Sequence, residues 1–206
     1  MSRKTRLLTS LIATLLIAGG TTASTESPLP IHDGVGGEFS APSSLDREVS
    51  LSEFRNKVVL IFFGYTSCQD ICPATLSHLK SLVRNMGKAS DDVQVLFVTV
   101  DPENDTPERL KKYLARFDPR FVGLTGEPAE MDRIAKLFMV KHTQSHGMEV
   151  PTEYNRSETF IDRAYLYSHS QQIYLLDKAG RTRALFFTGS PLDEMKDAIS
   201  ELLDES

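Results

Sequence analysis

The strongest constraint on this chain is an apolar run that ends at a glycine and is followed at once by its only two cysteines. Residues 58–63 are β-branched or aromatic apart from one leucine, which predicts a buried strand. Gly64 and the polar residues after it end that strand. Pro73 is typical of the first turn of a helix, where its missing N–H costs nothing. Cys68 and Cys72 therefore lie in a strand-to-helix corner, where the start of a helix stabilises thiolates.

The cysteine spacing argues against a purely structural disulfide. Two cysteines in an exported chain first suggest such a bond, but a cross-link over three intervening residues constrains very little chain. Four-residue spacing would instead place both side chains on the same side of a first helical turn. Two thiolates there could close a redox disulfide or bind one soft metal ion. Copper(I) prefers thiolate ligands, whereas a structural zinc site would need two more donors.

The N-terminus has the layout of a secretory signal. Residues 1–24 combine a basic start, an apolar stretch shorter than the roughly 20 residues of a membrane span, and small residues at a cleavage position. We expect an exported, periplasmic protein, which an uncleaved leader would anchor to the inner membrane. The leader carries three of the 23 basic residues and none of the 28 acidic ones, so the rest has a net charge of −8. This balance argues against nucleic acid as a partner.

The remaining chain is long enough for one domain with a sizeable core. Residues 25–44 are rich in Pro, Gly and Ser and predict a linker, and residues 45–206 predict the domain. Strands and helices alternate before a strand hairpin and a final helix, which predicts an α/β fold with a thioredoxin-like mixed sheet flanked by helices. A long polar loop, residues 141–163, precedes the hairpin. The predicted strands are 93–100, 121–124, 173–176 and 183–187, and the predicted helices are 73–86, 107–117, 128–138 and 192–203.

A third metal donor could come from one of the five histidines. His169 stands just before the strand at 173–176, where thioredoxin-like sheets bring a loop against the cysteine corner. We therefore predict that its imidazole faces the thiols. The pair in the long loop, together with a nearby methionine, could also bind a metal, although ordinary loop residues are the simpler interpretation. The candidates other than His169 are His32 in the linker, His78 on the surface of the cysteine helix, and His142, His146 and Met148 in the loop.

Three motifs in order are similar to the Sco/SenC family. They are Gly-Tyr-Thr-Ser-Cys-x-x-x-Cys-Pro at 64–73, Val-Asp-Pro-x-Asn-Asp-Thr-Pro at 100–107, and His169-Ser170 ahead of Tyr-Leu-x-Asp-x-x-Gly at 174–180. The similarity extends over about residues 39–203, which is nearly all of the predicted domain. The combination of ordered motifs is specific, whereas the cysteine spacing alone would be weak.

The resemblance implies a thioredoxin-like fold and a copper site formed by Cys68, Cys72 and His169. It also implies a function in assembly of the copper centre of cytochrome c oxidase, as metal donor or as reductant of the target's cysteines. The reduced cysteines would bind copper(I), and copper(II) is a second candidate because imidazole suits it. The implied partners are a copper-receiving oxidase subunit and other copper chaperones or thioredoxin-like reductants.

The chain departs from the family pattern in two places. Ser168 stands where an aspartate commonly precedes the histidine, and the segment before that histidine is longer than usual. The first departure weakens arguments about groups that would orient the ligand. Asp101 matches the family's acidic position after the second strand, where turn geometry explains it at least as well as direct chemistry.

Two other functions fit the same residues. A thiol-disulfide oxidoreductase or thiol peroxidase would also use a cysteine pair at this corner, although three intervening residues are unusual for a dithiol enzyme and His169 has no evident part in disulfide exchange. A copper store or sensor is the third alternative, because the sequence does not separate storage from delivery. We therefore expect a binding protein more than an enzyme.

Overall fold

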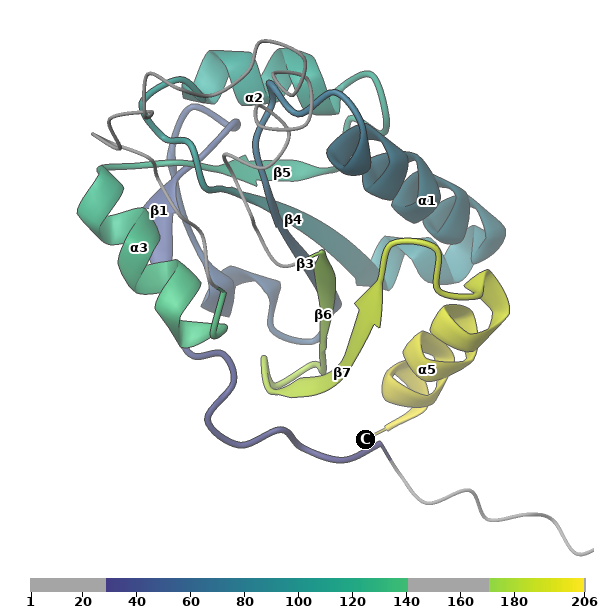
Figure 1. Ribbon diagram of the computed structural model, residues 1–206. Helices are drawn as coiled ribbons and strands as arrows, with labels where there is room; N and C mark the ends of the chain where they lie inside the picture. The colour runs from purple at the N-terminus through teal and green to yellow at the C-terminus, as the bar shows by residue number, and fades with distance from the viewer. Residues whose placement is uncertain (1–28, 141–170, 206) are drawn as a thin grey trace, which may run out of the picture.

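A computed structural model describes residues 29–140 and 171–205. Its main feature is a five-stranded sheet with the order β5–β4–β3–β6–β7 (Figure 1). A separate two-stranded sheet pairs β1 with β2. The strands are β1 Ser40–Pro42, β2 Glu48–Ser50, β3 Val58–Gly64, β4 Val93–Thr99, β5 Val122–Leu124, β6 Gln172–Leu176 and β7 Thr182–Phe187.

The large sheet is mixed, as predicted. Strand β3 pairs in parallel with β4, and β4 with β5, whereas β6 runs antiparallel to both β3 and β7. Every residue of β3 is buried, which explains its continuous apolar run. The register pairs Phe62 with Ile173, so the start of β6 lies beside the end of β3 that leads to the cysteines.

The helices begin and end close to the predicted positions. Pro107 opens α2, and Gly87, with a φ of 58°, follows the end of α1 close to the predicted end at residue 86. The cysteine helix begins at Ile71, two residues earlier than predicted. The helices are α1 Ile71–Asn85, α2 Pro107–Leu114, α3 Pro128–Leu137 and α5 Leu192–Asp204, with short 3₁₀ helices η1 Leu51–Phe54 and η2 Gly87–Asp92.

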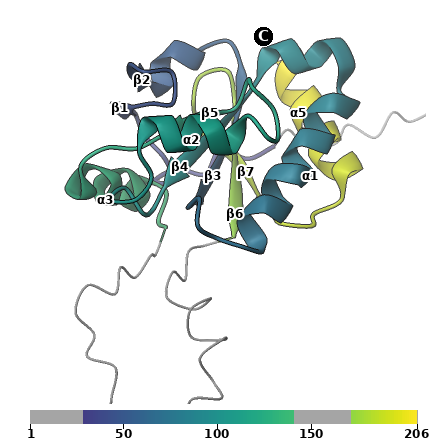
Figure 2. The ribbon, with the colours of Figure 1, turned by 90° about the horizontal axis from the view of Figure 1, so that it is seen from above.

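Two hydrophobic layers cover the sheet. Alternate β3 side chains point to opposite faces, so Leu60 and Phe62 pack with α1, α2 and α5, whereas Ile61 and Phe63 pack with α3 and the small sheet. Figure 2 shows α3 and the small sheet on one side of the strands and α1 and α5 on the other. This arrangement confirms the predicted sheet flanked by helices on both faces.

The described part of the predicted linker packs against the domain. Phe39 and Ala41 are buried, and the backbone N–H of Gly36 donates to the carbonyl of Leu137 at 2.6 Å. The short strand β1 lies within this segment and pairs with β2 of the domain. The domain boundary at residue 45 stays a prediction.

Several predictions concern residues outside the described ranges. These include the secretory leader and the whole of the long loop, residues 141–163. Within residues 29–140 and 171–205, no helix is both long and apolar enough to cross a membrane. The individual residues concerned are His142, His146, Met148, Ser168 and His169.

Candidate metal centre

The two cysteines lie at the end of β3, in the turn that leads into α1. Cys68 closes a turn by donating its N–H to the carbonyl of Tyr65 at 3.3 Å. Cys72 lies in the first turn of α1 and donates its backbone N–H to the Cys68 sulfur at 3.4 Å. Both are thiols, and Cys72 is fully buried whereas Cys68 is half-buried. The corner therefore presents one accessible sulfur and one held inside.

The expectation that both cysteines project from one helical turn is wrong for Cys68. The helix is capped at Asp70, so Cys68 precedes it. The physical reason is that the polar turn after β3 is long enough to bring Cys68 back over the first N–H groups of the helix. Its sulfur then accepts a helical N–H, which is the position where a helix start stabilises an anion.

The surroundings of Cys72 favour its protonated form. The pKa of the Cys72 thiol is raised, first by its hydrogen bond to the Cys68 sulfur and then by burial. The Cys68 sulfur also accepts the backbone N–H of Cys72 at 3.4 Å, so the two residues are directly coupled. A metal held by both sulfurs would have to displace the Cys72 proton, so binding would release it.

Gly64 is a site residue that sequence reasoning treated only as a strand end. A Cβ built on Gly64 would lie 3.0 Å from the Cys72 sulfur and 2.8 Å from Cε2 of Phe97. No side chain fits there unless its neighbours move. Glycine at this position therefore lets the buried sulfur pack directly on the β3 backbone. A glycine at the end of a core strand is the only signal in the sequence, and it does not identify the neighbour.

Asp105 holds the turn before Cys68 in place. Its buried carboxyl accepts hydrogen bonds from the N–H of Thr66 at 3.0 Å, from the Thr66 hydroxyl, and from the Thr99 hydroxyl at 2.7 Å. Burial raises the pKa of Asp105, and these hydrogen bonds only partly offset it. Asp105 therefore ties the cysteine corner to the end of β4.

The turn between β4 and α2 confirms the structural interpretation of Asp101. Its carbonyl accepts the N–H groups of Asn104 and Asp105, and its carboxylate accepts the Asn104 side-chain amide at 2.9 and 3.1 Å. Thr106 is the N-cap of α2, because its hydroxyl accepts the N–H of Arg109 at 3.2 Å. The motif therefore shapes the loop beside the cysteines.

Tyr113 of α2 is a second residue that the sequence did not identify. Its ring packs against Phe97 at 5.9 Å between centroids, and its hydroxyl is buried without a hydrogen-bond partner among the described residues. Burial raises the pKa of this phenol, and the nearby Cys72 and Cys68 sulfurs raise it further. Helical periodicity predicts an apolar contact for Tyr113 but not its proximity to the sulfurs.

The described residues supply only part of a metal site. Within them, no group of three His, Cys, Asp or Glu side chains is arranged to hold an ion. Two adjacent thiols, one of them buried, suit a soft ion such as copper(I). His169, the predicted third ligand, lies outside the described residues, and His78 is half-buried rather than at the surface.

Comparisons with known proteins agree with the fold and the motifs. The SCO1/SenC family pattern matches residues 30–204. An SCO2-like protein of Rickettsia conorii is 32% identical over 161 residues, covering 78% of this chain and 73% of the relative. The structure resembles copper-bound ScoI of Bradyrhizobium japonicum, with TM-score 0.67, 34% identity, and 82% of this chain and 99% of that chain covered. It also resembles copper-bound yeast Sco1, with TM-score 0.69, 28% identity, and 84% and 90% covered.

The match covers the α/β domain from its first buried segment to the last helix, and the thioredoxin-like Sco fold is confirmed. Both the cysteine corner and the turn that supports it lie inside the matched region. This chain is a member of the SCO1/SenC family.

Proposed function

We propose that this protein binds copper through Cys68, Cys72 and His169 and serves assembly of the copper site of a cytochrome oxidase. The observation that carries the proposal is the pair of adjacent thiols at the end of β3, in a fold shared with copper-bound ScoI at 34% identity. A protein of similar fold, BsSco, is described as a member of the Sco family of cytochrome c oxidase assembly proteins. Copper is then the cargo, and an oxidase subunit receives it.

Chain connectivity supports His169 as the third ligand. The described chain resumes before β6, and Ile173 in that strand pairs with Phe62, near the end of β3. His169 precedes Gln172 by three residues, and such a segment spans at most about 10 Å. The tether therefore keeps the imidazole near the end of β3, from which the turn to the cysteines departs.

The redox state of the cysteines would control copper binding. Oxidation joins the two sulfurs in a disulfide, releases two protons and two electrons, and removes both thiolate ligands. Because Cys72 retains its proton in the described state, we also expect copper(I) affinity to increase with pH. A reductant that opens the disulfide would restore binding.

Export to the periplasm belongs to the same proposal. Residues 1–24 support it through their basic start and apolar stretch, and either cleavage or retention as an anchor would keep the domain outside the cytoplasm. Mass spectrometry of the protein purified from a periplasmic fraction would reveal whether the leader is removed. Recovery of the intact chain in the cytosol would contradict export.

An anaerobic titration with copper(I), in competition with a chromogenic chelator, tests the ligand set. Cys68→Ser and Cys72→Ser should each weaken binding by roughly 100-fold or more, because structural metal sites gain several kcal/mol per ligand. His169→Ala should weaken binding by a similar factor, whereas His32→Ala, in the N-terminal segment, should not. Unchanged affinity in His169→Ala would remove the third ligand.

A thiol-disulfide oxidoreductase is the second candidate, and the unequal burial of the cysteines favours it. An accessible Cys68 could attack a disulfide while the buried Cys72 resolves the mixed disulfide. Turnover of insulin disulfides or of peroxide by the metal-free protein would support this alternative. Oxidase activity in a deletion strain, with and without added copper, separates the two, since copper should rescue only a loss of delivery.

A further inference from the structure

A positively charged hollow borders the cysteine corner. It has a volume of about 370 Å³ and is lined by Thr66 together with four residues of α2 and the turn that follows it. Three of these four residues are basic, on a chain whose exported part carries a net charge of −8. The hollow is therefore a local exception to the charge of the protein. The residues of α2 and its following turn are Arg109, Lys112, Tyr113 and Arg116.

Arg109 joins the hollow directly to the cysteine motif. Its Nε donates to the hydroxyl of Thr66 at 2.7 Å, and one terminal nitrogen donates to the hydroxyl of Ser67 at 2.8 Å. Ser67 precedes Cys68 in the chain. The Arg109 Nε also lies 3.8 Å from Oδ1 of the buried Asp105, but the side chain remains 48% exposed and keeps terminal N–H donors available to a ligand. A ligand held here would lie beside the accessible sulfur.

The other two cations are also placed at the surface. The Arg116 guanidinium lies over the ring of Tyr113 at 4.7 Å and donates to the Tyr113 carbonyl at 3.3 Å. Lys112 pairs with Glu108 at 2.7 Å, but both side chains are about three-quarters exposed. Exposed pairs of this kind are weak and exchange readily with another carboxylate. The ring of Tyr113 supplies an apolar wall between the charges.

We propose that this hollow binds a short acidic segment of the polypeptide that receives the metal. Three cations around a hydroxyl and an aromatic wall recognise carboxylates, since guanidinium groups match their geometry. The hollow is small enough for one or two side chains, and its wall includes Thr66, two residues before Cys68. It would thus orient the partner's metal-accepting residues toward the accessible sulfur. The inference rests on the proposed function.

Fluorescence anisotropy with a labelled hexaglutamate peptide tests the proposal, with hexaglutamine as the uncharged comparison. The double variant Lys112→Gln/Arg116→Gln should weaken hexaglutamate binding by roughly tenfold at low salt. Arg109 is left in place because its loss would also disturb Thr66 and Ser67. The control is Arg84→Gln/Lys88→Gln, which removes the same charge at the far end of α1 and should change binding less than twofold.

Equal losses in the two double variants would overturn the proposal, because they would reflect net charge alone. If millimolar inorganic phosphate displaced the labelled peptide as well as unlabelled hexaglutamate does, the proposal would also be overturned. The hollow would then be a site for small anions only. Copper(I) titration of Lys112→Gln/Arg116→Gln separates this inference from the proposed function. Unchanged copper affinity with unchanged peptide binding would reject the hollow and leave the copper site standing.

Discussion

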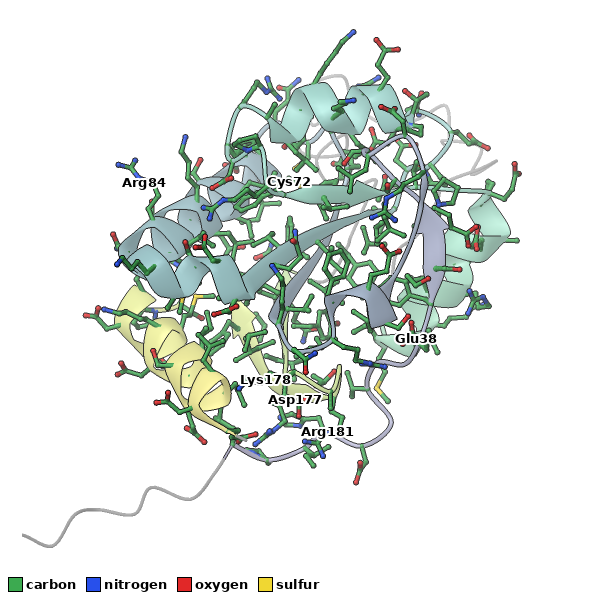
Figure 3. All side chains as sticks on the ribbon, turned by 180° about the vertical axis from the view of Figure 1, so that it is seen from behind. Glu38, Cys72, Arg84, Asp177, Lys178 and Arg181 are labelled. Atoms are coloured by element: carbon green, nitrogen blue, oxygen red, sulfur yellow. The ribbon has the colours of Figure 1, made fainter. Side chains whose placement is uncertain are left out.

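At the cysteine end of the sheet, the buried carboxyl of Asp105 is held mainly by amide and hydroxyl donors, whereas at the opposite end the buried carboxyl of Asp177 pairs with two arginines. Asp177 accepts from Nε of Arg181 at 2.8 Å and from Nη1 of Arg183 at 3.2 Å. Arg183 also forms a double contact with Glu205 at 2.6 and 2.7 Å. Figure 3 shows Cys72 at one end of the molecule and Asp177, with Arg181, at the other.

The two carboxyls consequently shift in opposite directions. Burial raises the pKa of Asp105 more than its hydrogen bonds lower it. Burial also acts to raise the pKa of Asp177, but hydrogen bonds from Arg181 and Arg183 outweigh it and the net pKa is lowered. Similar burial therefore has opposite consequences, depending on whether a cation faces the carboxylate closely.

The two ends of the sheet therefore have different roles: the Asp177 end stabilises the fold, and the cysteine end offers groups for chemistry. Around Asp177 the buried charges are paired, so this end stabilises the hairpin and the C-terminal helix. Near Cys72, whose thiol is buried, the hydroxyl of Tyr113 is also buried and has no hydrogen-bond partner among the described residues. Groups of that kind reduce stability but leave ligands available for another atom.

The largest effect is expected from Arg183→Met. It would leave Asp177 and Glu205 without their buried cation and should destabilise the protein by about 3–5 kcal/mol in urea unfolding. Arg181→Met is the matched control, because Arg181 is 51% exposed and should contribute no more than about 1 kcal/mol. Copper(I) affinity should not change in either variant. Equal losses of stability in Arg183→Met and Arg181→Met would contradict the special role of the buried cation.

Gly64→Ala should give an intermediate effect at the other end. The new methyl would crowd the Cys72 sulfur and Phe97, which should cost about 1–3 kcal/mol of stability and weaken copper(I) binding by roughly tenfold. Gly123→Ala provides the control, since its methyl would meet Leu110 Cβ at 2.9 Å. We expect similar destabilisation there without a change in copper affinity. A copper defect in both variants would show that general strain is the cause.

The smallest expected effect is the pH dependence of the free energy of unfolding. Both carboxyls start from an ordinary pKa of 3.8. The lowered pKa of Asp177 gives stability that is present above 3.8 and is lost as the pH falls through the lowered value. The raised pKa of Asp105 gives stability that is present below 3.8 and is lost as the pH rises through the raised value.

Unfolding free energies measured against pH therefore sharpen the comparison. Relative to Asp177→Asn, the wild-type protein should lose stability on acidification below 3.8. Relative to Asp105→Asn, it should lose stability as the pH rises from 3.8 toward neutrality. Slopes of the same sign in the two comparisons would contradict the assigned shifts.

Local patterns predicted most of the fold. The apolar runs at β3 and β4, Pro107 at the start of α2 and Gly87 after α1 each act over a few residues, so the sequence expresses them directly. The cysteine pair and its place after β3 were predicted for the same reason. His169 as a ligand stays a prediction, because it lies outside the described residues.

By itself the sequence determined the order of strands and helices, the family, and the corner that holds both sulfurs. Only the tertiary structure decided which sulfur is accessible and which groups surround the two sulfurs. Thr66 and Asp105 lie 39 positions apart, and Thr66 and Arg109 lie 43 apart, so their contacts exist only once β3, β4 and α2 have packed together. Pairing over such separations depends on the folded backbone, and no local pattern encodes it.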